Sequence, residues 1–125
     1  MIATLVAAAA LSTTAPSALP DRYVAFLKGV MEKDLPDYDS TKVKQAFIYE
    51  ASDEPGVLQP VMCVWANTKN RFGGYDGYRW IWVIRYTKNG NYDLMLDGNA
   101  QAECASHTDV SIDGHDYGPE LAPRP

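Results

Sequence analysis

Hydrophobic residues recur at helical spacing in the segment 18–36, which reads ALPDRYVAFLKGVMEKDLP. Five of them fall on one stripe of the expected helix: Tyr23, Phe26, Leu27, Val30 and Met31. Pro20 suits the first turn, and Asp21 complements the positive end of the helix dipole. The helix should end before Pro36, because the residue that precedes a proline disfavours the helical conformation.

Apolar and polar residues alternate from Val43 onwards, which is the period of β-strands. Four strands are expected, and they cover residues 43–50, 57–67, 78–86 and 92–97. The turn sequence SDEPG follows the first strand, and Asn89-Gly90 is a strong hairpin signal before the fourth. The third strand, YRWIWVIRY, is apolar on both faces at its middle, so we expect it in the centre of the sheet.

One helix ahead of four hairpin-connected strands is an α+β pattern. The simplest architecture is an N-terminal helix packed on a four-stranded antiparallel meander sheet. A length of 125 residues suits one globular domain, which we place at residues 18–107. Residues 108–125 are polar, and we expect them to form a flexible C-terminal tail.

Residues 1–17 have the features of a secretory signal peptide. Residues 2–11 form an apolar run that is far too short to span a bilayer, and small residues follow it. Cleavage after Ser12 or after Ser17 would satisfy the small-x-small rule. No Lys or Arg lies between Met1 and the apolar run, although a signal peptide usually begins with a basic residue. The alternative is therefore an Ala-rich N-terminal helix of the mature domain. The signal peptide predicts a periplasmic or secreted protein with no transmembrane segment in the mature chain.

Two cysteines, Cys63 and Cys104, are present in the whole sequence. In an exported protein a single pair of cysteines is expected to form a disulfide, whereas in the cytosol both would stay reduced. The bond would close a loop of about 40 residues, which the chain-entropy model values at about 4 kcal/mol. We therefore predict a Cys63–Cys104 disulfide.

The charge and the polar residues argue against several function classes. A net charge of −5 argues against a nucleic-acid partner or an anionic membrane surface. The two histidines and the paired acids lie in turns or near the C-terminus, so we expect no enzyme activity. The segment DVSIDGHDYGPE matches a calcium loop at Asp109, Ser111, Asp113, Gly114 and Glu120. Gly118 and Pro119 would break the exiting helix, and we expect neither a metal nor a cofactor.

An aromatic row marks the third strand. Tyr78, Trp80, Trp82 and Tyr86 share one face, and Trp65 and Tyr92 could join them from neighbouring strands. A flat row of rings could stack on sugars. The alternative is a core beneath the helix, which composition favours because the chain has only three phenylalanines to fill its interior.

The segment 67–77, NTKNRFGGYDG, is the candidate binding loop. It is about eleven residues long, whereas a hairpin connection needs about two to five. Its asparagines can bond nearby backbone, and its glycines permit positive φ. We found no structural reason for Lys69, Arg71 and Asp76, and only a partial one for Tyr75 as a packing anchor.

Long ordered loops on a rigid sheet often carry function, so this loop is the predicted partner-contacting surface. The predicted binding residues are Asn67, Lys69, Asn70, Arg71, Gly73, Gly74 and Tyr75. A loop that packs only on itself, with no partner, is the alternative.

Two stretches resemble a group of small uncharacterised secreted proteins of bacteria. The segment MEKDLPDYDSTKV keeps the Lys-Asp, Pro-Asp and Asp-Ser elements of their sequence LKDPDSAKF. The pattern C-x3-N-x-K-N-x2-G-G-Y-x-G-Y is matched throughout, although Val64 replaces the usual Gly after the Cys. The resemblance implies export, small size and a helix with a sheet, and it brings no established activity.

The sequence therefore predicts a small exported binding or interaction protein of the bacterial envelope. Its partner would be another protein or a cell-wall component. One alternative is a glycan- or peptidoglycan-binding module that uses the aromatic row. The other is a periplasmic hydrolase inhibitor that inserts the 67–77 loop into a cleft.

Overall fold

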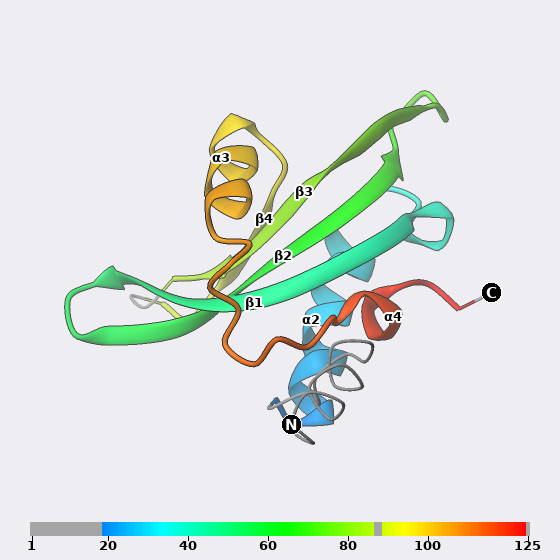
Figure 1. Cartoon of the computed structure of the whole chain (residues 1–125). Coiled ribbons are helices and arrows are strands. Elements are labelled where there is room, and N and C mark those ends of the chain that lie inside the picture. Colours follow the sequence, from blue (N-terminus) through cyan, green and yellow to red (C-terminus); the bar gives the residue numbers. More distant parts are fainter. Residues whose placement is uncertain (1–18, 87–88, 125) are drawn as a thin grey trace, which may run out of the picture.

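The computed structural model describes residues 19–86 and 89–124, and the predicted signal peptide, residues 1–17, lies outside them. The elements follow one another as α2 (Asp21–Asp34), the 3₁₀ helix η1 (Tyr38–Ser40), β1 (Lys42–Glu54), β2 (Val57–Lys69), β3 (Tyr75–Arg85), β4 (Tyr92–Met95), α3 (Gly98–Ser106) and α4 (Gly118–Leu121). The strands form one antiparallel sheet in the order β1-β2-β3-β4 (Figure 1). The predicted α+β class and four-stranded antiparallel sheet are confirmed.

The strands β2 and β3 are longer than predicted. β2 continues to Lys69 and β3 begins at Tyr75, and these two residues pair across the ladder. Only residues 70–74 connect the two strands, so the expected loop of about eleven residues is wrong. The added residues are mostly polar and lack the alternating pattern of a strand, so the sequence did not predict them. They still extend the strands, because the backbone groups of polar residues pair as well as those of apolar residues.

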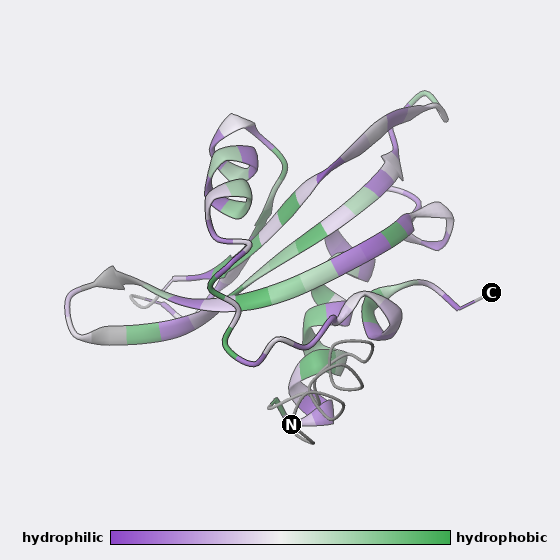
Figure 2. Cartoon of the chain, viewed as in Figure 1, coloured by the Kyte–Doolittle hydropathy of each residue, from purple (hydrophilic) through white to green (hydrophobic). Residues whose placement is uncertain are grey.

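The main core lies between the sheet and α2. Figure 2 shows apolar residues gathered along α2 and in the central parts of β1, β2 and β3. Helix α2 buries Val24, Leu27 and Met31, which have the i, i+3, i+7 spacing of one helical face. Phe26, which the predicted stripe included, is 51 % exposed. The core is completed by Leu35, Tyr38, Ala46, Ile48, Met62, Val64, Ala66, Ile81, Val83, Tyr117 and Leu121.

A second, smaller core lies on the opposite face of the sheet, beneath α3. It consists of Phe47, Tyr49, Val61, Cys63, Trp80 and Cys104. Helix α3 was not predicted. Its N-cap is Asp97, whose side chain accepts a hydrogen bond from the Ala100 amide at 2.9 Å.

Two sets of contacts hold α3 on the sheet. The predicted Cys63–Cys104 disulfide is confirmed, with the two Cα atoms 5.7 Å apart. The Gln101 side chain also accepts a hydrogen bond from the Trp80 amide at 2.7 Å and donates to the Trp80 carbonyl at 2.8 Å. Helix α3 is therefore fixed covalently to β2 and by hydrogen bonds to β3.

The aromatic row does not form the core beneath the N-terminal helix. Strand alternation directs Ile81 and Val83 towards α2, and it directs Trp80 and Trp82 towards α3. The expected core beneath the N-terminal helix is wrong for this row, because α3 supplies a second buried face. Tyr92 lies on the α2 side and contacts the Phe26 ring edge-on at 4.9 Å between ring centroids.

The C-terminal segment packs against the sheet. The amides of Ile112 and Tyr117 donate to the carbonyls of Ile48 and Ala46 in β1, at 2.8 and 3.0 Å. Tyr117 and Leu121 are completely buried. This packing contradicts the expected flexible tail over residues 108–125. The segment covers the outer edge of β1, and an edge strand left open is a site for unwanted pairing.

The pH dependence of stability should report on this packing. Burial, aided by the negative charges of Glu32 and Asp39, raises the pKa of Tyr38 to about 12. The Tyr38 hydroxyl donates to the Leu121 carbonyl at 2.6 Å. The folded state therefore holds the phenol proton more tightly than the unfolded chain, whose tyrosine pKa is about 10.

We expect this contribution of Tyr38 to be complete below pH ~10 and to be lost as the pH rises towards 12. Urea midpoints measured from pH 9 upwards should fall, and Tyr38→Phe should make the fall shallower. Some slope should remain, because burial also raises the pKa values of Tyr23 and Tyr49. An identical slope in Tyr38→Phe would contradict this account.

Candidate functional site

The connection between β2 and β3, residues 70–74, forms an ordered tip that we call the hairpin tip. The Asn70 side-chain oxygen accepts hydrogen bonds from the amides of Phe72 and Gly74, at 2.9 and 3.1 Å. Its amide nitrogen donates to Asp76 at 3.0 Å. The Asn70 backbone also donates to the Gly74 carbonyl at 2.8 Å and accepts from the Gly73 amide at 3.0 Å. Asn70 therefore organises the whole tip.

A second asparagine fixes the strand leading out of the tip. The Asn67 side-chain oxygen accepts a hydrogen bond from the Gly77 amide at 3.1 Å. Gly73 and Gly77 have φ values of 85° and 99°, which strongly favour glycine. Gly74 has no positive φ, and a Cβ atom added to it would meet the Asn70 side chain only at an ordinary contact distance of 3.8 Å. Two of the three glycines are therefore required by backbone conformation.

Tyr75 anchors the base of the hairpin to the chain before β1. Its ring centroid lies 4.6 Å from the Lys42 ammonium and 5.7 Å from the Lys69 ammonium. Its hydroxyl donates to the Ser40 carbonyl at 2.7 Å. Lys69 also lies 3.9 Å from an Asp37 carboxylate oxygen. The two stretches that carry the sequence resemblance therefore contact each other.

These contacts change the roles expected from the sequence. Lys69 and Asp76 do have structural partners, so the expectation that nothing in the fold accounts for them is wrong. Tyr75 is the packing anchor suggested by the sequence, and it is still 40 % exposed. Of the predicted contact residues, Arg71 is exposed at the tip, and its side chain has no role in holding the hairpin.

Phe72 is the residue that sequence analysis missed. It is 88 % exposed, which is the highest value among the large apolar residues described. The only signal in the sequence was a large apolar side chain between Arg71 and Gly73 in an otherwise polar loop. The hairpin tip thus presents an arginine and a phenylalanine on a backbone held by Asn70.

Replacement of Asn70 tests whether the tip is preorganised. We expect Asn70→Ala to lower the free energy of unfolding by about 1 kcal/mol, because three side-chain hydrogen bonds disappear from an exposed loop. Arg71→Ala is the matched control, and it should leave the stability unchanged within about 0.5 kcal/mol. Urea denaturation measures both. Equal stabilities of Asn70→Ala and the wild type would show that the side chain does not order the tip.

The rings of the aromatic row pack against one another on the α3 side. Trp65 stacks on Tyr78 with ring centroids 6.1 Å apart and tilts against Trp80 at 5.0 Å. The Lys44 ammonium lies 4.8 Å from the Tyr78 centroid. Trp80 is itself buried, at 8 % exposure. The row is therefore interrupted by a covered ring and does not form one continuous flat platform.

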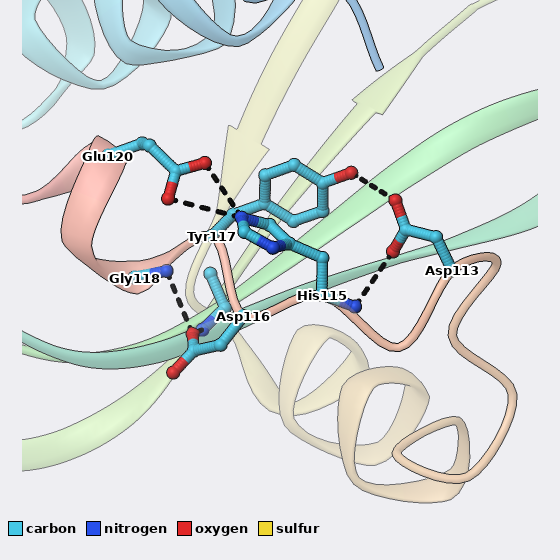
Figure 3. Close-up of polar contacts among 7 residues, drawn as sticks. Asp113, His115, Asp116, Tyr117, Gly118 and Glu120 are labelled. Carbon is cyan, nitrogen blue, oxygen red and sulfur yellow. Dashed lines mark hydrogen bonds and ion pairs between the residues drawn. The ribbon is translucent and has the colours of Figure 1, made fainter. Parts of the chain in front are cut away.

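Three acids of the calcium-like segment, Asp113, Asp116 and Glu120, are engaged in local contacts (Figure 3). Asp113 accepts hydrogen bonds from the His115 amide at 3.0 Å and from the Tyr117 hydroxyl. Glu120 contacts His115 Nε2 at 2.9 Å. Asp116 accepts from the amides of Ala46 and Gly118, at 2.9 and 2.8 Å. These carboxylates hold the C-terminal segment in shape against β1.

Within residues 19–86 and 89–124, no cluster of three or more His, Cys, Asp and Glu side chains is arranged to hold a metal ion. In the same ranges, no helix is long and apolar enough to cross a membrane. Comparisons of the chain with protein-family models, with curated proteins and with solved structures found no match.

Proposed function

We propose that the chain is a small exported binding protein of the bacterial envelope and that the hairpin tip contacts its protein partner. The observation that carries this proposal is Phe72, 88 % exposed on an ordered loop. Burying a phenylalanine side chain contributes about 1.5–3 kcal/mol, and here the fold does not use it. Aromatic and arginine side chains at the centre of an interface often supply most of its binding energy.

The order of the hairpin tip indicates that the exposed Phe72 serves binding and is not simply tolerated by the fold. The Asn70 hydrogen bonds hold the backbone, and Tyr75 fixes the hairpin base to Ser40. A loop that is ordered before binding loses little conformational entropy on association. The tip can therefore present Phe72 and Arg71 in one geometry, as a selective contact requires.

The shape of the tip favours a partner with a cleft. One projecting apolar side chain fills a pocket, whereas a flat interface needs a broad apolar patch. Arg71 beside it favours an acidic residue at the rim of that cleft. The hydrolase-inhibitor form of the function fits this geometry. The Cys63–Cys104 disulfide fits an oxidising compartment, where export would deliver the chain.

Site-specific photo-crosslinking in the producing cells tests the proposal. A benzophenone amino acid replaces Phe72 in one variant and Leu58 in a matched control. Leu58 is also exposed, at 67 %, but it lies beside the β1–β2 turn at the opposite end of β2. We expect irradiation to give a discrete heavier species from position 72 and none from position 58.

Two results would count against the proposal. Absence of any crosslinked species from position 72 in cells that export the protein would remove the hairpin tip as the contact surface. Equal crosslinking from positions 72 and 58 to the same proteins would indicate non-specific contact of exposed apolar residues.

A further inference from the structure

The end of the sheet that carries the hairpin tip is positively charged, although the whole chain has a net charge of −5. We call it the hairpin end, and it consists of residues 37–44 and 66–79. It holds five basic and three acidic residues, a net charge of +2, which leaves −7 for the rest of the chain. The five cations are Lys42, Lys44, Lys69, Arg71 and Arg79.

Strand pairing places these cations around the hairpin. Lys42 of β1 pairs with Asn67 of β2, which pairs in turn with Tyr78 of β3. Strand alternation directs Tyr78 to the α3 side of the sheet and Arg79 to the α2 side. A flat partner surface would reach one face only, whereas a cleft that takes in the hairpin contacts both.

Four of the five cations, all except Lys69, are available to a partner. They are exposed, and none of them forms an ion pair with a carboxylate of residues 19–86 and 89–124. Two nearby acids are engaged elsewhere, because Asp37 lies 3.9 Å from Lys69 and Asp76 accepts a hydrogen bond from Asn70. Like charges gathered without partners repel one another, so they do not stabilise the free protein.

Aromatic rings hold two of the exposed cations in place. The Lys42 ammonium lies 4.6 Å from the Tyr75 centroid, and the Lys44 ammonium lies 4.8 Å from the Tyr78 centroid. A cation–π contact at an exposed site contributes about 0.5–1 kcal/mol, which restrains the charged group. These ammonium groups therefore lose less conformational entropy when they pair with a carboxylate of a partner.

An acidic protein fits the hairpin end better than an anionic polymer does. Phe72 needs an apolar pocket, which a charged polymer lacks. A long polymer would also extend over the rest of the chain, whose net charge of −7 repels it. A compact protein with acidic side chains around an apolar cleft meets only the hairpin end.

We propose that Lys42, Lys44, Arg71 and Arg79 steer the hairpin tip into an apolar cleft with an acidic rim on a partner protein. The cations of β1 and β3 extend the contact surface beyond the tip. This role rests on the proposed function, because Phe72 must enter that cleft. Charges around an interface mainly raise the rate of association, whereas contacts at its centre mainly lower the rate of dissociation.

Crosslinking in cells from position 72 is the first test. Lys42→Gln/Lys44→Gln removes two positive charges from the hairpin end, and Arg22→Gln/Lys33→Gln removes two from exposed positions of α2. Because both double variants have the same net charge, only the position of the lost charge differs. We expect the heavier species to fall at least about threefold in the first variant and to keep the wild-type yield in the second.

Surface plasmon resonance then measures the two rates. The probe is the protein crosslinked from position 72, immobilised and exposed to the same variants at ~50 and ~500 mM NaCl. At the lower salt, Lys42→Gln/Lys44→Gln should lower the association rate constant at least about fivefold, with the dissociation rate constant within about twofold of the wild type. High salt should remove this difference, because it screens exposed charges.

The results distinguish the steering surface from the contact of Phe72. If position 72 of the wild type gave no crosslinked species, both proposals would be overturned. Equal yields or equal association rate constants in the two double variants would overturn the steering surface and leave the contact of Phe72 standing. A crosslinked species in which mass spectrometry finds no second protein would identify a non-protein partner and would overturn both.

Discussion

Replacing both Cys63 and Cys104 with alanine should lower the free energy of unfolding by about 2–5 kcal/mol. The disulfide spans 41 positions, so its loss releases a long segment of the unfolded chain. It is also the covalent attachment of α3 to β2. A loss of that size is a large share of the total stability of about 5–15 kcal/mol that is typical of a domain.

Urea unfolding of the double variant and the wild type measures this change. Ala105→Ser, at an exposed position of α3, is the control and should stay within about 0.5 kcal/mol of the wild type. If the free energy of unfolding of the double variant were lower than that of the wild type by less than about 1 kcal/mol, packing alone would hold α3 on the sheet.

Leu121→Ala should lower the free energy of unfolding by about 3 kcal/mol, within the range found for buried leucines. Leu121 is completely buried in the core between α2 and the sheet, although it lies only four positions before the last residue. The substitution removes apolar contacts and leaves a cavity beside Tyr38, whose hydroxyl bonds to the Leu121 carbonyl.

The same urea experiment separates a packed C-terminal segment from a flexible one. Val110→Ala is the matched control, because Val110 belongs to the same segment and is 52 % exposed. It should change the stability by no more than about 0.5 kcal/mol. If Leu121→Ala were equally mild, the segment would contribute little to the core.

The strands were predictable because alternation and turn residues are local signals. Asn89-Gly90 and the SDEPG turn separated strands that pair in sequence order. The disulfide was predictable because two cysteines allow only one pairing within the chain. The lengths of the strands were harder to predict. Lys69 pairs with Tyr75, and this pairing depends on the neighbouring strand rather than on a hydrophobic pattern in the sequence.

Two elements could not be found from local patterns. Helix α3 is short, and Gly98 and Asn99 at its start disfavour a helix, so its stability comes from the disulfide and from Gln101. The C-terminal segment looks polar, and only Tyr117 and Leu121 reveal that it packs. Tertiary contacts, which a local sequence pattern does not contain, stabilise both α3 and the C-terminal segment.

The structure confirms the order of the predicted loop and changes the roles of several of its residues. Asparagine and glycine chemistry indicated an ordered loop, and Asn70 does organise it. Lys69 and Tyr75 turned out to anchor the base, because their partners Asp37 and Ser40 lie far away in sequence. The exposure of Phe72 could not be known without the position of the tip relative to the core.

The central claim is that Phe72 contacts the partner, and a dissociation constant tests it most directly. The protein crosslinked from position 72 is purified and titrated with the wild type, Phe72→Ala and Leu58→Ala by calorimetry. A central aromatic contact predicts at least about tenfold weaker binding for Phe72→Ala, an unchanged melting temperature, and wild-type affinity for Leu58→Ala. Binding by Phe72→Ala within about twofold of the wild type would contradict the claim.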